Sequence, residues 1–149
     1  MRITLSTTSN KYFEAYFDKE FGLYELYWLE ASQDMTDDEY KKLMSQQLQA
    51  MHESNLFGIW EHQLLDNRLN YFTMSPELQE WQNEHIGKPM LQELGDYPKT
   101  AFIQSEDFIT QLSFEQTLDE TDETTGMVRY FDNVAEAKTW LLGVADTAD

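Results

Sequence analysis

The residues best suited to chemistry lie where a predicted strand gives way to a predicted helix. Asp66 ends the strand expected over residues 61–66, and Glu77 and Glu80 lie on the helix that follows. Two carboxyl groups facing one crevice can divide the roles of general acid and general base. However, the chain holds 28 acidic residues, so chance proximity is expected. Asp66 is better interpreted as a residue that caps the turn or pairs with Arg68. A carboxylate-dependent hydrolase is therefore the least favoured hypothesis.

Other patterns of catalytic residues are missing from the sequence. The three histidines, His52, His62 and His85, show no metal-binding spacing. The glycines form no phosphate-binding loop, and no serine stands in a nucleophile elbow. The absence of cysteine excludes disulfides, thiolate metal sites and cysteine nucleophiles. The sequence therefore predicts no metal, no cofactor and no enzymatic activity.

Composition and charge restrict the class of protein and of partner. The 149 residues suit one domain, and 41% apolar with 14% aromatic residues is too much for a disordered chain. The net charge of −18 excludes a nucleic-acid partner, because binding to phosphates needs clustered Lys and Arg. No apolar run approaches the roughly 20 residues of a membrane span. We therefore expect a cytoplasmic protein with a protein partner.

The elements expected to position these residues can be read from periodicity and capping signals. Aromatic-rich stretches at 12–17 and 23–29 predict a β-hairpin after a frayed, polar segment of residues 1–10. Thr36 and Glu39 form a capping box for a helix that continues to about Ser54.

Helices and strands then alternate along the rest of the chain. Ser75 and Pro76 begin a helix that Gly87 and Pro89 should break or kink. Further strands are expected at 61–66, 100–104 and 127–131, a third helix from Ser105, and a last helix over 134–141. The order ββαβαβαβα predicts an α/β fold with a mixed five-stranded sheet, in which only the hairpin is antiparallel.

Right-handed crossovers would place the crossover helices on one face of such a sheet. The other face would then carry Tyr12, Tyr16, Leu23 and Tyr27, with no helix assigned to cover them. Exposed apolar patches of this kind are often interfaces. We therefore expect these residues to form the contact of a possible homodimer.

Four stretches carry a resemblance to a known family: LLDNR at 64–68, SPELQEW at 75–81, QLSFEQT at 111–117 and RYFDNVAEAKTWL at 129–141. With the hairpin and the capped helix, they resemble STAS-like proteins, and most closely the bacterial SpoIIAA-like or STAS/Sec14-like group. The resemblance implies a SpoIIAA-like STAS fold and a small regulatory domain. Its best-known members are switched by phosphorylation of a serine at a helix start, within an Asp-Ser-Ser-Gly motif. Here Asp66 is followed by Asn67 and Arg68, so Ser75 is interpreted as a helix cap rather than a switch.

Two functions from different classes follow from this reading. The first is a non-enzymatic regulatory domain that acts through protein contacts, with Asp66, Arg68, Tyr71 and Phe72 as its binding residues. The second is a carrier or sensor of a small apolar, lipid-like ligand, as in lipid-binding relatives of the family.

A set of methionines and aromatic residues bears on the second hypothesis, because Met is an adaptable apolar side chain. Ordinary core packing is the simpler interpretation of this set, and a small hydrophobic pocket near the loop of residues 69–74 is the alternative. The set comprises Met35, Met44, Met51, Met74, Met90, Met127, Phe57, Trp60, Tyr71, Phe72 and Trp81.

Overall fold

A computed structural model describes residues 2–6, 10–95, 98–104 and 128–143. Its centre is a six-stranded mixed sheet in which spatial order follows chain order. The first three strands are antiparallel neighbours, and the third to the sixth run parallel. The strands are β1 (Arg2–Thr4), β2 (Phe13–Asp18), β3 (Leu23–Trp28), β4 (His62–Asp66), β5 (Lys99–Ile103) and β6 (Val128–Phe131).

The hairpin of β2 and β3 forms because both strands alternate between two chemically different faces. Phe13, Ala15 and Phe17 are fully buried on one face, while Glu14 between them is exposed. The turn requires Gly22, whose φ of +60° is unfavourable for other residues. A Cβ at Gly22 would also lie 2.2 Å from the backbone oxygen of Ile59, so the turn packs directly on a neighbouring segment.

The helices begin at the capping residues that the sequence indicates. Thr36 and Glu39 form a complete capping box at the start of α1 (Asp37–Glu53). The Ser75 hydroxyl accepts the Leu78 N–H at the start of α2 (Pro76–Gln82), and Asn133 caps α5 (Val134–Leu142) in the same way. Short 3₁₀ turns, η1 (Glu30–Asp34) and η2 (Phe57–Ile59), flank α1.

The helix after Ser75 continues through the residues expected to break it. A π-helical turn, η3 (Asn83–Gly87), joins α2 to α3 (Lys88–Leu94), and Pro89 lies in the first turn of α3. Proline lacks a backbone N–H, and a wider turn before it is one way for a helix to accommodate that loss. Of the two predicted alternatives at Gly87 and Pro89, a break or a kink, the break is wrong: the helix continues there through a π-helical turn.

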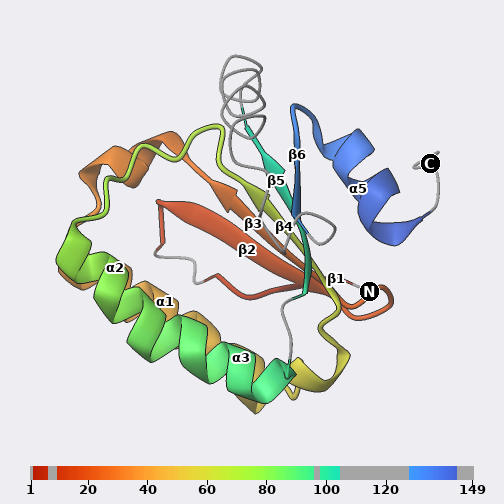
Figure 1. Ribbon diagram of the computed structural model, residues 1–149. Coiled ribbons are helices and arrows are strands. Elements are labelled where there is room, and N and C mark those ends of the chain that lie inside the picture. The colour runs from red at the N-terminus through yellow and green to blue at the C-terminus, as the bar shows by residue number, and fades with distance from the viewer. Residues whose placement is uncertain (1, 7–9, 96–97, 105–127, 144–149) are drawn as a thin grey trace, which may run out of the picture.

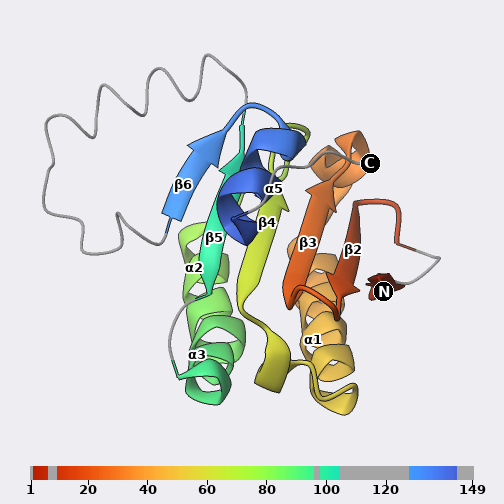
Figure 2. The same ribbon diagram turned by 90° about the vertical axis from the view of Figure 1, so that its right-hand side faces the viewer.

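The helices form a layer on each face of the sheet. Helices α1, α2 and α3 cover one face, and α5 covers β4 and β5 on the other (Figures 1 and 2). The first apolar cluster lies between the sheet and α1–α3, and the second lies under α5 around Leu64, Ala101 and Ala137.

The α/β class, the antiparallel hairpin and the parallel strands after it are confirmed, whereas three details of the predicted fold are wrong. The sheet has six strands instead of five, because Arg2–Thr4 pairs with β2 and places Ile3 opposite Phe17. Residues 2–4 are therefore not frayed. The second sheet face is not left without a helix, because α5 packs on it. The helix expected from Ser105 and the residue Met127 lie outside the described residues.

Candidate ligand-binding cavity

A cavity of about 570 Å³ lies between the sheet and the layer formed by α1, α2 and α3. Its walls are mainly aromatic and aliphatic, with four methionines among them. The aromatic residues of the lining are Tyr24, Trp28, Tyr40, Trp60, Phe72 and Phe102. The remaining apolar residues are Leu26, Met44, Leu48, Met51, Leu65, Met74, Ile86 and Met90.

The sheet contributes one wall because alternate residues of a strand point to the same face. Tyr24, Leu26 and Trp28 of β3 line the cavity, as do Gln63 and Leu65 of β4. The residues between them in sequence face α5 instead, and Leu64 lies in the second apolar cluster.

The helices contribute the opposite wall through residues three or four positions apart. Tyr40, Met44, Gln47 and Met51 recur at this spacing along α1. The α2–α3 rod contributes residues four positions apart, Gln82, Ile86 and Met90. Several of these inward-facing residues are only half-buried, because the cavity leaves part of their surface accessible.

The polar groups of the lining are five uncharged amides: Gln47, Gln63, Asn67, Asn70 and Gln82. Three of them use their carbonyl oxygen within the protein. The Tyr24 hydroxyl donates to Gln47 Oε1, the Tyr40 hydroxyl donates to Gln82 Oε1 at 2.7 Å, and the Phe72 N–H donates to Asn70 Oδ1 at 3.2 Å.

Both tyrosines stay protonated over the physiological range of pH. Burial raises the pKa of Tyr40 to about 12, and it raises the pKa of Tyr24 further. Their hydroxyls therefore remain hydrogen-bond donors, and the two glutamine carbonyls remain occupied.

Trp60 contributes a polar atom that the protein does not satisfy. Its side chain is 9% exposed and packs with its ring centroid 5.2 Å from that of Tyr24. Its Nε1–H is buried and has no hydrogen-bond partner among the described residues. A buried N–H without an acceptor is unfavourable, so this atom is a local cost to stability.

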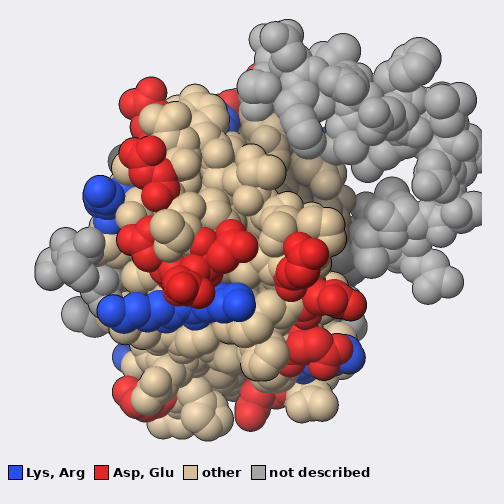
Figure 3. Space-filling view, turned by 90° about the vertical axis from the view of Figure 1, so that its left-hand side faces the viewer, with Lys and Arg blue, Asp and Glu red and all other residues tan. Residues whose placement is uncertain are grey.

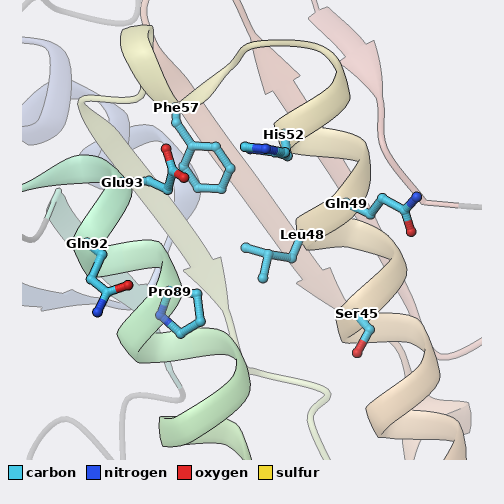
Figure 4. A pocket seen from close by; sticks show the side chains of 8 residues that line it. All are labelled: Ser45, Leu48, Gln49, His52, Phe57, Pro89, Gln92 and Glu93. Atoms are coloured by element: carbon cyan, nitrogen blue, oxygen red, sulfur yellow. The ribbon is translucent and has the colours of Figure 1, made fainter.

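A second, smaller hollow of about 390 Å³ lies between α1 and α3 (Figure 4). One side of this groove is formed by Ser45, Gln49 and His52 of α1. The other side is formed by Pro89, Gln92 and Glu93 of α3, and Phe57 lies at one end. Leu48 lines both this groove and the cavity. The two spaces are therefore neighbours, and the Leu48 side chain lies between them.

Asp66 and Arg68, two of the sequence-predicted binding residues, do not line this cavity. Asp66 lies on the sheet face that α5 covers, because it alternates with Gln63 and Leu65 along β4. It is buried and accepts two bonds from the Arg68 guanidinium, at 3.0 and 2.7 Å. The hydrogen bond to Asp66 raises the pKa of Arg68. The structure thus shows a bidentate ion pair that fixes the turn after β4, the role that the turn interpretation gave to Asp66.

The other two predicted loop residues, Phe72 and Tyr71, lie in different surroundings. Phe72 lines the cavity and stacks on Tyr40, with ring centroids 5.2 Å apart. Tyr71 is 49% exposed and points elsewhere, while its backbone N–H donates to the Ser32 hydroxyl. Ser75 has the N-cap geometry described above, and its hydroxyl is occupied by the Leu78 N–H at 3.1 Å.

The residues predicted as a dimer interface do not share one open surface. Tyr12 is buried in the first cluster and its hydroxyl donates to Glu39 of α1, so its expected orientation is wrong. Leu23 is 2% exposed and lies in the cluster under α5, so the expectation that it is uncovered is also wrong. Tyr16 and Tyr27 do occupy the second face, with ring centroids 6.1 Å apart, and the homodimer itself stays a prediction.

The sequence predicts only part of the cavity. The methionine and aromatic set includes Met44, Met51, Met74 and Met90, so the signal for an adaptable apolar site was present. The amides were missed, although Gln47 on the apolar stripe of α1 and Gln82 near Trp81 were legible as polar residues in apolar surroundings.

The exterior of the protein is strongly acidic. Figure 3, which views the side on which α1 and α2 begin, shows Asp and Glu side chains in several groups with few Lys or Arg between them. Asp37, Asp38 and Glu39 in the first turn of α1 and Glu77 in that of α2 are favoured by the helix dipoles. Within the described ranges, no three His, Asp or Glu side chains gather as metal ligands, and no helix is long and apolar enough to cross a membrane.

The chain was compared with models of protein families, with curated proteins and with solved structures, and none of them matches it. The resemblance to STAS-like proteins therefore stays a prediction, and function has to be inferred from the site itself.

Proposed function

We propose that the protein binds a small, mostly apolar molecule in the cavity between the sheet and helices α1–α3, as a carrier or sensor. The observation that carries this proposal is the cavity itself. Its volume of about 570 Å³ falls inside the range of roughly 300–1,000 Å³ typical of small-molecule sites. A predominantly apolar and aromatic lining with a few placed polar groups is also typical of such sites.

The chemistry of the lining favours binding over catalysis. The described lining residues offer amides, aromatic rings and thioethers, and none is an acid, a base or an activated nucleophile. The two tyrosines have raised pKa values and donate to amide carbonyls, so neither is prepared to accept a proton. A regulatory role through protein contacts stays a prediction and is compatible with ligand binding, since a sensor passes its state to a partner.

Native mass spectrometry of protein purified from its host tests the proposal directly. We expect a fraction of the protein to retain an apolar mass, and ligand-free protein to bind the neutral fluorescent probe Nile red. Leu65→Trp should abolish both, because the larger ring would occupy the cavity that Leu65 lines. Leu69→Trp is the matched control, since Leu69 is 42% exposed and does not line the cavity.

Circular dichroism and a thermal melt establish that both variants fold. The proposal is overturned if wild-type protein carries no extra mass and does not bind Nile red. It is also overturned if Nile red binding survives Leu65→Trp in a folded protein, because the dye would then bind elsewhere.

A further inference from the structure

The polar groups around the cavity restrict the chemistry of its ligand, and this inference rests on the proposed function. We infer that the cavity takes a neutral molecule with an apolar, ring-bearing body and an uncharged polar group, such as an amide, that bonds to the amide side chains of the lining. Carboxylates, phosphates and ammonium groups are excluded from the ligand. The reasons are the charge of the lining, its uncharged hydrogen-bonding groups and the aromatic walls.

No charged side chain lines the cavity in the described part of the chain, although 26% of all residues are charged. An anionic group on the ligand would be removed from water without a cation to balance it, which is strongly unfavourable. The net charge of −18 adds a repulsion against any anion that approaches. A cationic group would likewise have no carboxylate partner within the lining.

The hydrogen bonds inside the protein leave NH₂ groups of the lining for a ligand. Gln47, Asn70 and Gln82 have their carbonyl oxygens occupied by Tyr24, Phe72 and Tyr40, as described above. Gln47 Nε2 reaches only the Met44 sulfur, at 3.8 Å, and the bond of Gln82 among the described residues uses its oxygen and not its NH₂ group.

The lining also offers acceptors. The Gln63 NH₂ donates to Thr100 Oγ1 at 2.9 Å, so its Oε1 is the group left for a ligand. The cavity therefore presents uncharged donors together with uncharged acceptors, which matches a neutral amide better than a charged group.

The aromatic walls favour a ligand with a flat ring. The rings of Tyr40 and Phe72 stack at an interplanar angle of 10°, and Tyr24 and Trp60 form a tilted pair beside the amides. Ring pairs of this kind contribute beyond the area that they bury. A flexible alkyl chain would gain less from such walls.

The test uses four probes with one ring system and different polar groups: 2-naphthamide, 2-naphthoate, 2-(aminomethyl)naphthalene and 2-ethylnaphthalene. Dissociation constants come from isothermal titration calorimetry with the full chain. We expect the amide to bind more than tenfold more tightly than the ammonium probe at pH 7, since burial of an unpaired charge is strongly unfavourable. The amide should also bind about 2- to 10-fold more tightly than the ethyl probe, as one hydrogen bond predicts.

The pH dependence of the carboxylate probe separates exclusion of charge from a simple difference in shape. If only its protonated form binds, its apparent dissociation constant should rise about tenfold for each pH unit above the carboxyl pKa. The amide should show no such dependence between pH 6 and 8.

The outcomes distinguish the two proposals. If the carboxylate probe binds as tightly as the amide without pH dependence, the inference of a neutral ligand is wrong and the proposed function stands. If the amide binds no more tightly than the ethyl probe, the assigned bond to the amides of the lining is wrong. If none of the four probes binds, both the inference and the proposed function are overturned.

Discussion

The carboxylate of Glu25 is fully buried, and its surroundings give a prediction about stability that can be worked out from the structure. Glu25 is 1% exposed on the sheet face that carries α5. Arg2 of β1 lies 3.4 Å from one carboxylate oxygen, and Lys138 of α5 lies 3.3 Å from the other. The Tyr27 hydroxyl donates to the same oxygen as Lys138, at 2.5 Å. Two cations and one hydroxyl therefore compensate a single buried charge.

The magnitude depends on which partner is removed. At 3.3 Å and an effective dielectric constant of about 20, one such contact is worth about 5 kcal/mol before desolvation. Arg2 and Lys138 keep 46% and 28% of their side chains exposed, so both can turn to water when Glu25 is replaced. Glu25 has no such alternative. We therefore expect Glu25→Gln to destabilise the fold by only about 1–2 kcal/mol, because the cations left behind are solvated.

Removal of both cations should be worse than removal of the acid. Arg2→Met together with Lys138→Met would leave a buried carboxylate with only the Tyr27 hydroxyl. Breaking a buried pair in this way typically costs about 3–5 kcal/mol. Adding Glu25→Gln to that double variant should restore stability, since no buried charge would then remain.

Urea denaturation followed by circular dichroism measures these differences, provided that the m-values agree between variants. Lys88→Met is the matched surface control, because Lys88 pairs with Glu84 at 2.5 Å with both side chains more than half exposed. That control should change stability very little, because water and salt screen an exposed ion pair. The reasoning is refuted if the double cation variant is as stable as Glu25→Gln, or if adding Glu25→Gln to it gives no recovery.

Three further predictions concern the helix cap at Thr36, the pH dependence of stability that Glu39 causes, and the turn at Gly22. Thr36→Ala should lower the free energy of unfolding by about 0.5–2 kcal/mol by deleting the capping box, whereas Thr36→Ser should retain most of it, as urea melts would show. The pKa of Glu39 lies below its ordinary value because it accepts hydrogen bonds from the Tyr12 hydroxyl and the Thr36 N–H. Its ionised form thus stabilises the fold above about pH 4.3, and this contribution is lost as the pH falls through the lower folded value. Glu39→Gln should reduce the fall in urea midpoint between pH 6 and 3, and an unchanged fall would contradict the linkage. Gly22→Ala should destabilise far more than Gly95→Ala in a thermal melt, because both have positive φ but only at Gly22 would the new Cβ meet a backbone oxygen, at 2.2 Å; equal losses would contradict the steric argument.

The sequence predicts the local elements well because local rules determine them. Capping at Thr36, Ser75 and Asn133 involves residues within one helical turn, and each acts as expected. The hairpin is legible for the same reason, since alternation in β2 and β3 assigns Phe13 and Trp28 to one face without knowledge of distant partners.

What the sequence does not predict depends on contacts between distant segments. The sequence predicts that the second sheet face is partly exposed to solvent, because Glu14 and Glu25 alternate with tyrosines. In the structure, however, Glu25 is buried. Its burial requires Arg2 and Lys138, which lie 23 positions before it and 113 positions after it. No local periodicity links a strand at one end of the chain to a helix at the other.

The cavity is missed for a related reason, since periodicity tells which way a residue points but not how far away the opposite wall lies. On the α5 side, fully buried Ala101 of β5 and Ala137 of α5 let the helix approach the sheet closely. On the α1 side the facing residues are large and partly polar. The Tyr24–Gln47 bond spans from β3 to α1 and joins the Tyr24 hydroxyl to Gln47 Oε1.

The Tyr40–Gln82 bond ties α1 to the α2–α3 rod in the same way across the roof of the cavity. Phe72 stacks against Tyr40 and supports that roof from the loop before α2. Long side chains joined end to end act as spacers, because closing the gap would break a buried hydrogen bond and leave both partners unsatisfied. A core meant only for stability would use shorter apolar residues and close the gap, as the α5 side does with its alanines. We therefore infer that specific bonds maintain the space between the sheet and α1–α3, and this arrangement supports the proposed ligand site.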